Sequence, residues 1–262
     1  MMEQFNLWEN TPGLCEETPI VKVFVPENKK SDAAVVIFPG GGYYKRALHE
    51  GDGYAEFLSS HGITAFVVEY RVYPHTFPLP LLDARRGVRF ARANAEKYGI
   101  DKNKIAVMGS SAGGHLAAMT STYTKPIDFE NLDKIDKEDF LPNAQILCYP
   151  VIVQPDSDGV AHKGSYKNLL GGRNLGMETA LNPAKNVTKT TPPAFIWHTA
   201  ADGGVNVINS YAFATELRKK NVPCEMHIFP EGRHGLGLAE SVPHTAQWSA
   251  LLINWFKNLS WL

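Results

Sequence analysis

The chain has 262 residues, which is enough for one α/β domain with a large buried core. Its 26 lysines and arginines balance 27 aspartates and glutamates, and the basic residues are dispersed. This composition argues against a nucleic-acid-binding protein and against binding to an anionic membrane surface. A small neutral or weakly charged substrate fits it better.

The cysteines and the N-terminal segment bear on the compartment. Cys15, Cys148 and Cys224 are odd in number and far apart, and two lie in apolar, strand-like segments, which predicts buried thiols and no disulfide. Residues 1–10 lack the basic-then-apolar pattern of a signal peptide, and no stretch approaches membrane-spanning length. We therefore expect a cytoplasmic protein without a membrane segment.

The first half of the chain alternates predicted strands with predicted helices. Strands are expected at 18–25, 33–38 and 63–68, and helices at about 52–61 and 81–98. The segment 33–38 is apolar on both faces, which is typical of a central strand covered by helices. It ends in the glycine-rich run Pro39-Gly40-Gly41-Gly42-Tyr43.

The second half continues this alternation. Strands are expected at 104–108, 144–149, 194–198 and 225–229, and helices at 115–119, after Gly204 through Lys220, and at 241–261. The charged segment 124–139 is expected on a solvated surface, and the weakly periodic segment 151–191 as a cap-like insertion over the strand ends. One domain, 1–262, is predicted, with a mostly parallel, doubly wound sheet, helices on both faces, and ligands beyond the strand carboxyl ends.

The run Gly109-Ser110-Ser111-Ala112-Gly113 separates a predicted strand from a predicted helix. G-x-S-x-G in this context is the nucleophile elbow, in which the central serine occupies a strained turn. The helix that follows presents free N–H groups and the positive end of its dipole to a developing oxyanion. Ser111 is therefore the candidate nucleophile.

A serine hydroxyl needs a base, and the base needs a partner that orients it. His234 lies between Gly232 and Gly235 in the loop after the last predicted strand, and Asp202 lies in the loop after the strand ending at His198. The chain order serine, aspartate, histidine is that of the α/β-hydrolases. We predict His234 as general base and acid, and Asp202 as the residue that orients it.

The glycines after the first central strand predict an oxyanion hole. Only glycine lets the backbone approach a carbonyl carbon under attack so closely, and we assign the N–H groups of Gly41, Gly42 and Ala112 as donors. A phosphate-binding loop is the competing interpretation, but neither G-x-x-x-x-G-K-[ST] nor G-x-G-x-x-G is present.

With these residues, the sequence resembles the esterase/lipase branch of the α/β-hydrolase superfamily, in particular its compact carbohydrate (acetyl-xylan-type) esterases. The matching segments span about 33–260 and are Pro39–Tyr43, His49–Gly51, Glu69–Arg71, Gly109–Ala117, Thr191–Ala200 with Asp202, and Gly232–Gly235. Lipase-like relatives carry histidine where this chain has Pro39. The resemblance implies ester hydrolysis through an acyl-enzyme, with acetyl esters of sugars as expected substrates.

Several other residues are assigned supporting roles. His115 is expected to pack or hydrogen-bond under the elbow, Glu50 to hold the oxyanion loop, and Tyr43 to lie either in the core or on the substrate pocket wall, where we assign it to substrate binding. The charged residues of the helix 81–98, which include Asp83, Arg85, Arg86 and Arg89, are expected to form a solvated or ion-paired face.

The predicted function is hydrolysis of short-chain carboxylic esters, with a small-molecule ester such as an acetylated sugar as the binding partner and no nucleic acid or membrane. No cofactor is expected, and no metal, because no cluster has ligand spacing. Two alternatives stay open: an amide or formamide hydrolase with the same residues, and a catalytically inactive hydrolase fold that binds a partner. The sequence does not determine the oligomeric state; a homodimer is one alternative.

Overall fold

One eight-stranded sheet forms the centre of the computed structural model, which describes residues 1–13, 17–128, 133–155, 159–173, 176–177 and 179–262. The strands are β1 (Met2–Asn6), β2 (Ile20–Phe24), β3 (Ala34–Phe38), β4 (Thr64–Glu69), β5 (Ile105–Ser110), β6 (Ala144–Cys148), β7 (Ala194–Thr199) and β8 (Cys224–Phe229). Their spatial order is β1-β2-β4-β3-β5-β6-β7-β8. β2 is antiparallel to both of its neighbours, and the pairs from β4 through β8 are parallel.

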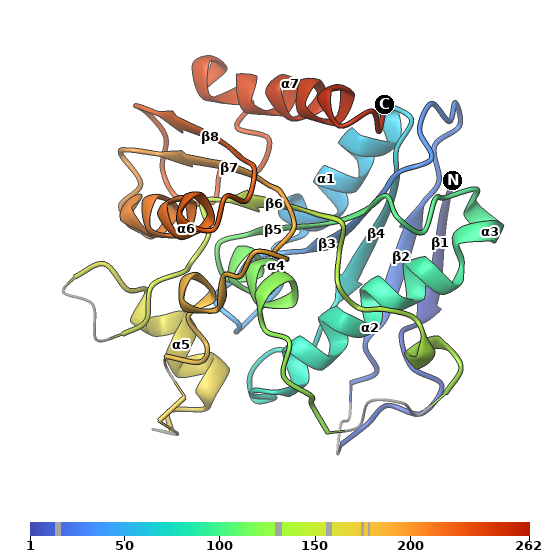
Figure 1. Ribbon diagram of the computed structural model, residues 1–262, viewed down its shortest axis with the longest axis horizontal. Helices are drawn as coiled ribbons and strands as arrows, with labels where there is room; N and C mark the ends of the chain where they lie inside the picture. Colours follow the sequence, from blue (N-terminus) through green and yellow to red (C-terminus); the bar gives the residue numbers. More distant parts are fainter. Residues whose placement is uncertain (14–16, 129–132, 156–158, 174–175, 178) are drawn as a thin grey trace.

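Helices cover both faces of this sheet (Figure 1). They are α1 (Leu48–Ser60), α2 (Leu79–Ala93), α3 (Ala95–Tyr98), α4 (Ala112–Thr122), α5 (Lys163–Leu170), α6 (Ile208–Lys219) and α7 (Pro243–Asn258), with short 3-10 helices η1 (Ile135–Lys137) and η2 (Pro183–Asn186). One hydrophobic core packs α1 and α7 against the sheet, and a second packs α2, α4 and α6 against its other face. The predicted α/β-hydrolase fold is thereby confirmed.

The register explains why the glycine-rich loop and the serine turn meet. β3 pairs with β5 so that Phe38 lies opposite Gly109, and β5 pairs with β6 so that Ser110 lies opposite Cys148. Because these strands are parallel, their carboxyl ends lie at one edge of the sheet, called here the carboxyl edge. The glycine-rich loop and the serine turn therefore leave the sheet side by side.

The sequence did not predict β1. Its residues, Met2 to Asn6, alternate between exposed and half-buried positions, and the strand pairs with β2 alone. An edge strand of this kind buries too little apolar surface to leave a clear pattern in the sequence. The single helix predicted for 81–98 is divided into α2 and α3 at Asn94.

Several charged residues are more buried than their local sequence indicates. Of the charged residues of α2, Asp83, Arg86 and Arg89 form ion pairs, as one of the two alternatives held. They are buried and not solvated, because residues 7–8 and the segment around η1 cover that helix. The described residues of the segment 124–139 are mostly exposed or half-buried, as predicted, although Asp136 within it is buried. Of the cysteines, which were predicted to be buried thiols, Cys148 is a buried free thiol as expected. The prediction was wrong for Cys224, which is exposed, and Cys15 lies outside the described residues.

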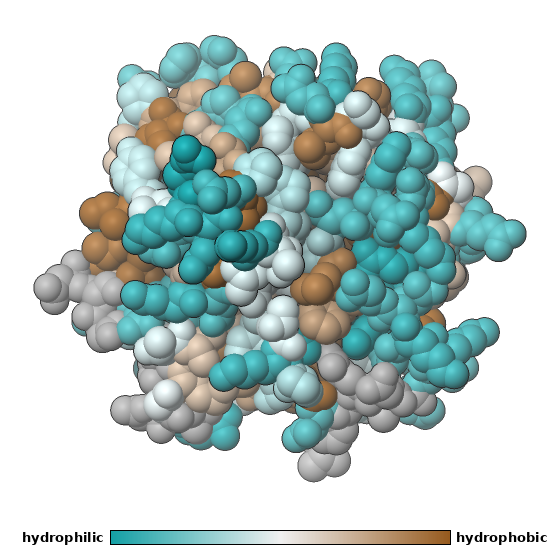
Figure 2. All heavy atoms as spheres, viewed as in Figure 1, coloured by the Kyte–Doolittle hydropathy of each residue, from teal (hydrophilic) through white to brown (hydrophobic). Residues whose placement is uncertain are grey.

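The outer surface agrees with the balanced composition. Figure 2 shows hydrophobic side chains scattered among hydrophilic ones on the face viewed. Across the described ranges, no helix is both long enough and apolar enough to cross a membrane.

Candidate active site

Ser111 occupies the turn between β5 and α4 with φ 54° and ψ −119°, a conformation that costs free energy for any residue with a side chain. Backbone hydrogen bonds hold it there. Its N–H donates to the carbonyl of Cys148 at 3.0 Å, and its carbonyl accepts from the N–H groups of His115 and Val151, both at 3.0 Å. The elbow predicted from G-x-S-x-G is therefore formed with its serine at the strained position.

The two motif glycines are required by close backbone contacts. A Cβ at Gly109 would lie 2.1 Å from the carbonyl oxygen of Gly113, and a Cβ at Gly113 would lie 2.0 Å from that of Phe38. Both distances are far shorter than any real contact to a side-chain carbon. The glycines thus let the first turn of α4 pack directly against the strands that carry the serine and the glycine-rich loop.

His234 lies beside the serine, on the loop that follows β8. Its Nε2 is 2.8 Å from Ser111 Oγ, and its Nδ1 is 2.7 Å from Asp202 Oδ2. A carboxylate only accepts hydrogen bonds, so Nδ1 carries the proton and Nε2 accepts from the serine hydroxyl. The structure therefore brings together all three residues that the sequence singled out, in a chain of two hydrogen bonds.

Asp202 is held ionised by four donors. Its Oδ1 accepts from the N–H groups of Gly204 at 2.8 Å and Val205 at 2.9 Å, while Oδ2 lies 2.7 Å from His234 Nδ1 and 3.2 Å from His198 Nε2. Burial alone would raise the pKa of Asp202, but the bonds from His198 and His234 outweigh it and hold the pKa well below its usual range. The carboxylate is thus kept charged opposite the histidine.

Sequence reasoning missed His198, the second histidine on this carboxylate. It is fully buried, its Nδ1 is 2.8 Å from Ser210 Oγ, and its Nε2 is 2.9 Å from the carbonyl of Val205. A carbonyl only accepts, so Nε2 is the protonated nitrogen and faces Asp202 as a donor. Its position four residues before the aspartate, at the end of a buried strand, was the available signal.

The glycine-rich loop passes over the serine turn. Gly41 and Gly42 adopt φ values of 126° and 67°, and a Cβ at Gly40 would lie 3.2 Å from Ser111 Cβ. The Gly40 N–H donates to Glu50 Oε2 at 2.9 Å, so this donor is already used. Ala112 is the first residue of α4, where an N–H has no partner within the helix.

Glu50 holds this loop, as the sequence predicted. Its carboxylate is buried and receives the Gly40 N–H, and the Tyr70 hydroxyl donates to the carbonyl of Pro39 at 2.7 Å. The carbonyl of Pro39 is thus fixed by a tyrosine that directly follows β4.

Of the two alternatives for Tyr43, the structure supports the core. The side chain is 1% exposed, and its hydroxyl lies 2.7 Å from His115 Nδ1. The His115 Nε2 is 2.7 Å from the carbonyl of Leu181, so the ring links the glycine-rich loop to the segment before η2. His115 therefore hydrogen-bonds beneath the elbow, as predicted.

The segment 151–191, predicted as a cap-like insertion, carries α5 and η2 and contacts the glycine-rich loop. The Asn168 side chain donates to the carbonyl of Gly42 at 2.8 Å. The Tyr166 hydroxyl donates to the carbonyls of Ile152 at 3.1 Å and Leu181 at 3.2 Å, which ties α5 to its own segment. In Figure 1, α5 lies at the periphery of the molecule, beyond α4 and α6.

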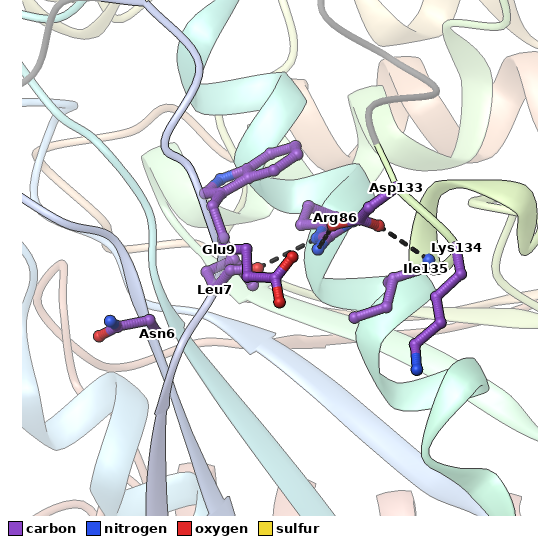
Figure 3. A pocket seen from close by; sticks show the side chains of 8 residues that line it. Asn6, Leu7, Glu9, Arg86, Asp133, Lys134 and Ile135 are labelled. Carbon is purple, nitrogen blue, oxygen red and sulfur yellow. Dashed lines mark hydrogen bonds and ion pairs between the residues drawn. The ribbon is translucent and has the colours of Figure 1, made fainter.

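A cavity of about 490 Å³ lies elsewhere, between residues 6–9 and the segment 133–135 (Figure 3). Figure 3 shows Arg86 between these two segments, where it donates to the carbonyl of Leu7 and pairs with Asp133. Three strands separate β1 from β5, so this cavity is remote from Ser111. In the part of the chain that the structure describes, no group of three or more His, Cys, Asp or Glu side chains could hold a metal ion.

Comparison with known proteins places this arrangement in a family. A family model described as BD-FAE matches residues 21–217. The chain is 39% identical to endo-1,4-beta-xylanase B of Butyrivibrio fibrisolvens over 218 residues. The aligned region covers 81% of this chain and 34% of that protein. It is 33% identical to an acetylxylan esterase of Xylanibacter ruminicola over 244 residues. That aligned region covers 90% of this chain and 47% of that protein.

The chain thus spans between about a third and a half of the length of these two relatives, at 34% and 47%. A solved structure agrees along nearly the whole chain. The acetyl ester-xyloside bifunctional hydrolase of Caldicellulosiruptor lactoaceticus is 40% identical, with a TM-score of 0.92 over 99% of this chain and 97% of that one. The chain therefore belongs to the BD-FAE family of α/β-hydrolases.

Proposed function

We propose that the protein is a serine esterase in which Ser111 is the nucleophile, His234 the general base and acid, and Asp202 the residue that orients His234. One observation carries this proposal. The serine at the strained elbow lies 2.8 Å from a histidine nitrogen, and the other nitrogen of that histidine lies 2.7 Å from a buried carboxylate. These contacts support a hydroxyl that can lose its proton as it attacks.

The reaction has two halves. Ser111 Oγ attacks the ester carbonyl carbon while its proton moves to His234 Nε2, and the N–H groups of Gly41, Gly42 and Ala112 stabilise the resulting oxyanion. The tetrahedral intermediate collapses to an acyl-enzyme, and the proton on Nε2 passes to the departing alcohol oxygen. Water then attacks the acyl carbon, His234 takes its proton and returns one to Ser111, and the acid is released.

Acetyl esters of carbohydrates are the substrates we propose. The support comes from relatives: a protein named acetylxylan esterase matches 90% of this chain, and a bifunctional hydrolase of acetyl esters and xylosides matches 99% of it. We also propose that the segment 151–191 shapes the part of the pocket that receives the alcohol of the ester. The hydrogen bond from Asn168 to the carbonyl of Gly42 supports this, because it holds α5 against the glycine-rich loop.

A fluorophosphonate probe followed by a substrate panel tests the proposal. The panel contains p-nitrophenyl acetate, butyrate and octanoate, acetylated xylo-oligosaccharides, and an aryl formamide. Ser121→Ala is the matched control for Ser111→Ala, because Ser121 is also a buried serine, and its hydroxyl only donates to the carbonyl of Ala117 within α4. We expect the probe to label the wild type and Ser121→Ala, and not Ser111→Ala.

The panel separates the alternatives that the sequence left open. Release of acetate from the oligosaccharides, with the p-nitrophenyl rate falling as the acyl chain lengthens, agrees with the proposal. A preference for octanoate contradicts the carbohydrate assignment, and faster cleavage of the formamide favours the amidase. Absence of labelling at Ser111, together with no turnover of any ester, indicates an inactive fold that binds a partner.

A further inference from the structure

Three buried side chains, Tyr54, Tyr149 and Glu50, form a hydrogen-bonded chain beneath the site, called here the buried network. At one end the Tyr54 hydroxyl lies 2.9 Å from Ser110 Oγ, next to the proposed nucleophile. The Tyr54 and Tyr149 hydroxyls are 3.2 Å apart, and the Tyr149 hydroxyl donates to Glu50 Oε1 at 2.8 Å. The network therefore begins at the elbow and ends at a carboxylate.

The same network contacts the other two loops of the site. Glu50 Oε2 accepts the N–H of Gly40 at 2.9 Å, which fixes the glycine-rich loop. The Tyr149 hydroxyl accepts the N–H of Gly237 at 3.0 Å, three residues after His234. Beside it, His49 Nε2 lies 3.0 Å from the carbonyl of Gly235. Two side chains thus join the proposed oxyanion donors to the loop that carries the proposed base.

Tyr149 has a strained backbone, and its ring packs against the ring of His234. Its φ is 37°, in the left-handed region that residues with side chains avoid. Its N–H donates to the carbonyl of Trp197 at 2.7 Å, and its ring meets the His234 ring edge-on, with centroids 5.2 Å apart and planes at 74°. Strain that persists beside an active site is maintained by the surrounding packing, and here it sets both a hydroxyl and a ring against the His234 loop.

Glu50 is a buried charge that the proposed chemical steps do not use. Its side chain is 3% exposed, and His49 Nε2 lies 3.8 Å from its Oε1. Burial raises the pKa of the Tyr54 and Tyr149 hydroxyls well above the usual value, so both stay protonated and can donate. Burying a carboxylate costs stability unless donors satisfy it, and its donors here are the groups whose positions matter for catalysis.

We propose that Glu50 and Tyr149 are positioning residues that fix the oxyanion donors relative to His234. This inference rests on the proposed function, because it assigns roles within the same site. Neither side chain touches the substrate; they act through Gly40 and through the Gly237 backbone. Loss of the connection separates the oxyanion donors from the base, which weakens transition-state stabilisation more than substrate binding.

Three variants test the proposal against kcat, KM and the rate of fluorophosphonate labelling. Glu50→Ala removes both contacts and lowers kcat about 100-fold, with KM changed less than about threefold. Glu50→Gln can accept from Gly40 and donate to the Tyr149 hydroxyl, so it keeps kcat within about fivefold. Tyr149→Phe removes the contacts of the Tyr149 hydroxyl with Glu50, Tyr54 and Gly237, keeps the Glu50 contact with Gly40, and lowers kcat about tenfold.

Asp136→Asn is the matched control, because it changes another buried carboxylate, one that pairs with Arg86 away from the site. It lowers the unfolding midpoint and leaves kcat per folded molecule unchanged. Wild-type kcat and labelling in folded Glu50→Ala would overturn the inference, as would a raised KM at constant kcat. If Glu50→Ala does not fold, equal kcat in Glu50→Gln, Tyr149→Phe and wild type overturns it.

The experiments distinguish a failure of the proposed function from a failure of the positioning inference. If the wild type hydrolyses no ester in the panel, that proposal is wrong, while the labelling rate still reports on the positions of Ser111 and His234. Slower labelling of Glu50→Ala and Tyr149→Phe, with Glu50→Gln close to wild type, then supports the positioning role. Equal labelling of all four proteins overturns it.

Discussion

The protein buries two polar clusters against its sheet, and they differ in how their charges are met. Along α2, Arg71 forms a two-pronged pair with Asp83, with its Nε and Nη2 at 2.8 and 2.7 Å from the two carboxylate oxygens, and the Trp8 ring N–H adds a bond of 2.9 Å. Arg86 pairs in the same way with Asp133 and Asp136. In this cluster each aspartate forms a direct ion pair with an arginine.

Beneath the site, the charges of Glu50 and Asp202 are met by N–H groups, hydroxyls and histidines. Full pairing of arginine with carboxylate fixes a structure and leaves no group to react. Partial neutralisation by polar donors leaves His234 able to take a proton from Ser111 in the proposed reaction. The difference explains why α2, rich in charged residues, serves the fold, while the catalytic chemistry is proposed at the carboxyl edge of the central strands.

The largest expected effect is a loss of activity with little change in stability. Ser111→Ala removes the proposed nucleophile and should lower kcat about 10⁴-fold or more, with KM little changed. It also removes one hydrogen bond to His234, so the free energy of unfolding should change by less than about 1 kcal/mol. Initial-rate kinetics and urea denaturation measure the two quantities. Residual turnover above about 1% of wild type would contradict the assignment.

The next largest effect is a loss of stability with little change in activity. Arg71→Met leaves Asp83 buried without its cation and should lower the free energy of unfolding by about 3–5 kcal/mol. The kcat of the folded fraction should stay within twofold. Lys104→Met is the control, because its pair with Asp32 is partly exposed and should contribute less than about 1 kcal/mol. Equal losses in the two variants would mean that burial of the Arg71 pair does not matter.

The same comparison shows how far the sequence leads. Short motifs with fixed geometry, such as the elbow at Ser111 and the glycines after β3, point to the proposed site because the chemistry restricts which residues can occupy these positions. The aspartate and histidine follow from chain order, since parallel strands end at one edge. These residues could be found without knowing what packs on them.

Burial of polar residues could not be found in this way. Asp83 was expected on a solvated or ion-paired face, and its burial does not follow from the local sequence because Trp8, which covers it, lies 75 residues away. Its partner Arg71 is covered in the same way by Pro12, 59 residues away. Tyr43 followed the glycines and was assigned to the pocket, yet its ring turns inward to His115. Exposure depends on contacts distant in sequence, which local periodicity does not record.

His115 gives a pH test of the core beside the site. Burial lowers its pKa to about 4, from an ordinary value near 6.5, against a smaller opposing effect of its bond to Leu181. The unfolded chain therefore binds more protons between pH 6.5 and pH 4, and the folded state loses roughly 3 kcal/mol of stability as pH falls through that range.

Urea denaturation at pH 7, 5.5 and 4.5 measures this loss. His115→Gln cannot titrate, so the difference in stability between wild type and variant should shrink as pH falls. Asp202, whose pKa is also lowered, contributes stability that is present above the ordinary value of 3.8 and lost at lower pH, outside this range. A difference that stays constant from pH 7 to 4.5 would show that His115 accepts a proton without disrupting the core.

The smallest expected effect concerns Tyr43. Tyr43→Phe removes the hydroxyl bonded to His115 Nδ1 and leaves the ring in place, so it should lower the free energy of unfolding by about 1 kcal/mol. Tyr44→Phe is the control, because Tyr44 is exposed and its ring stacks on Tyr73, so its loss of a hydroxyl should cost nothing measurable. KM for acetylated oligosaccharides should stay at the wild-type value in Tyr43→Phe, since the hydroxyl faces the core. A raised KM without loss of stability would instead place that hydroxyl on the substrate and restore the role that the sequence predicted.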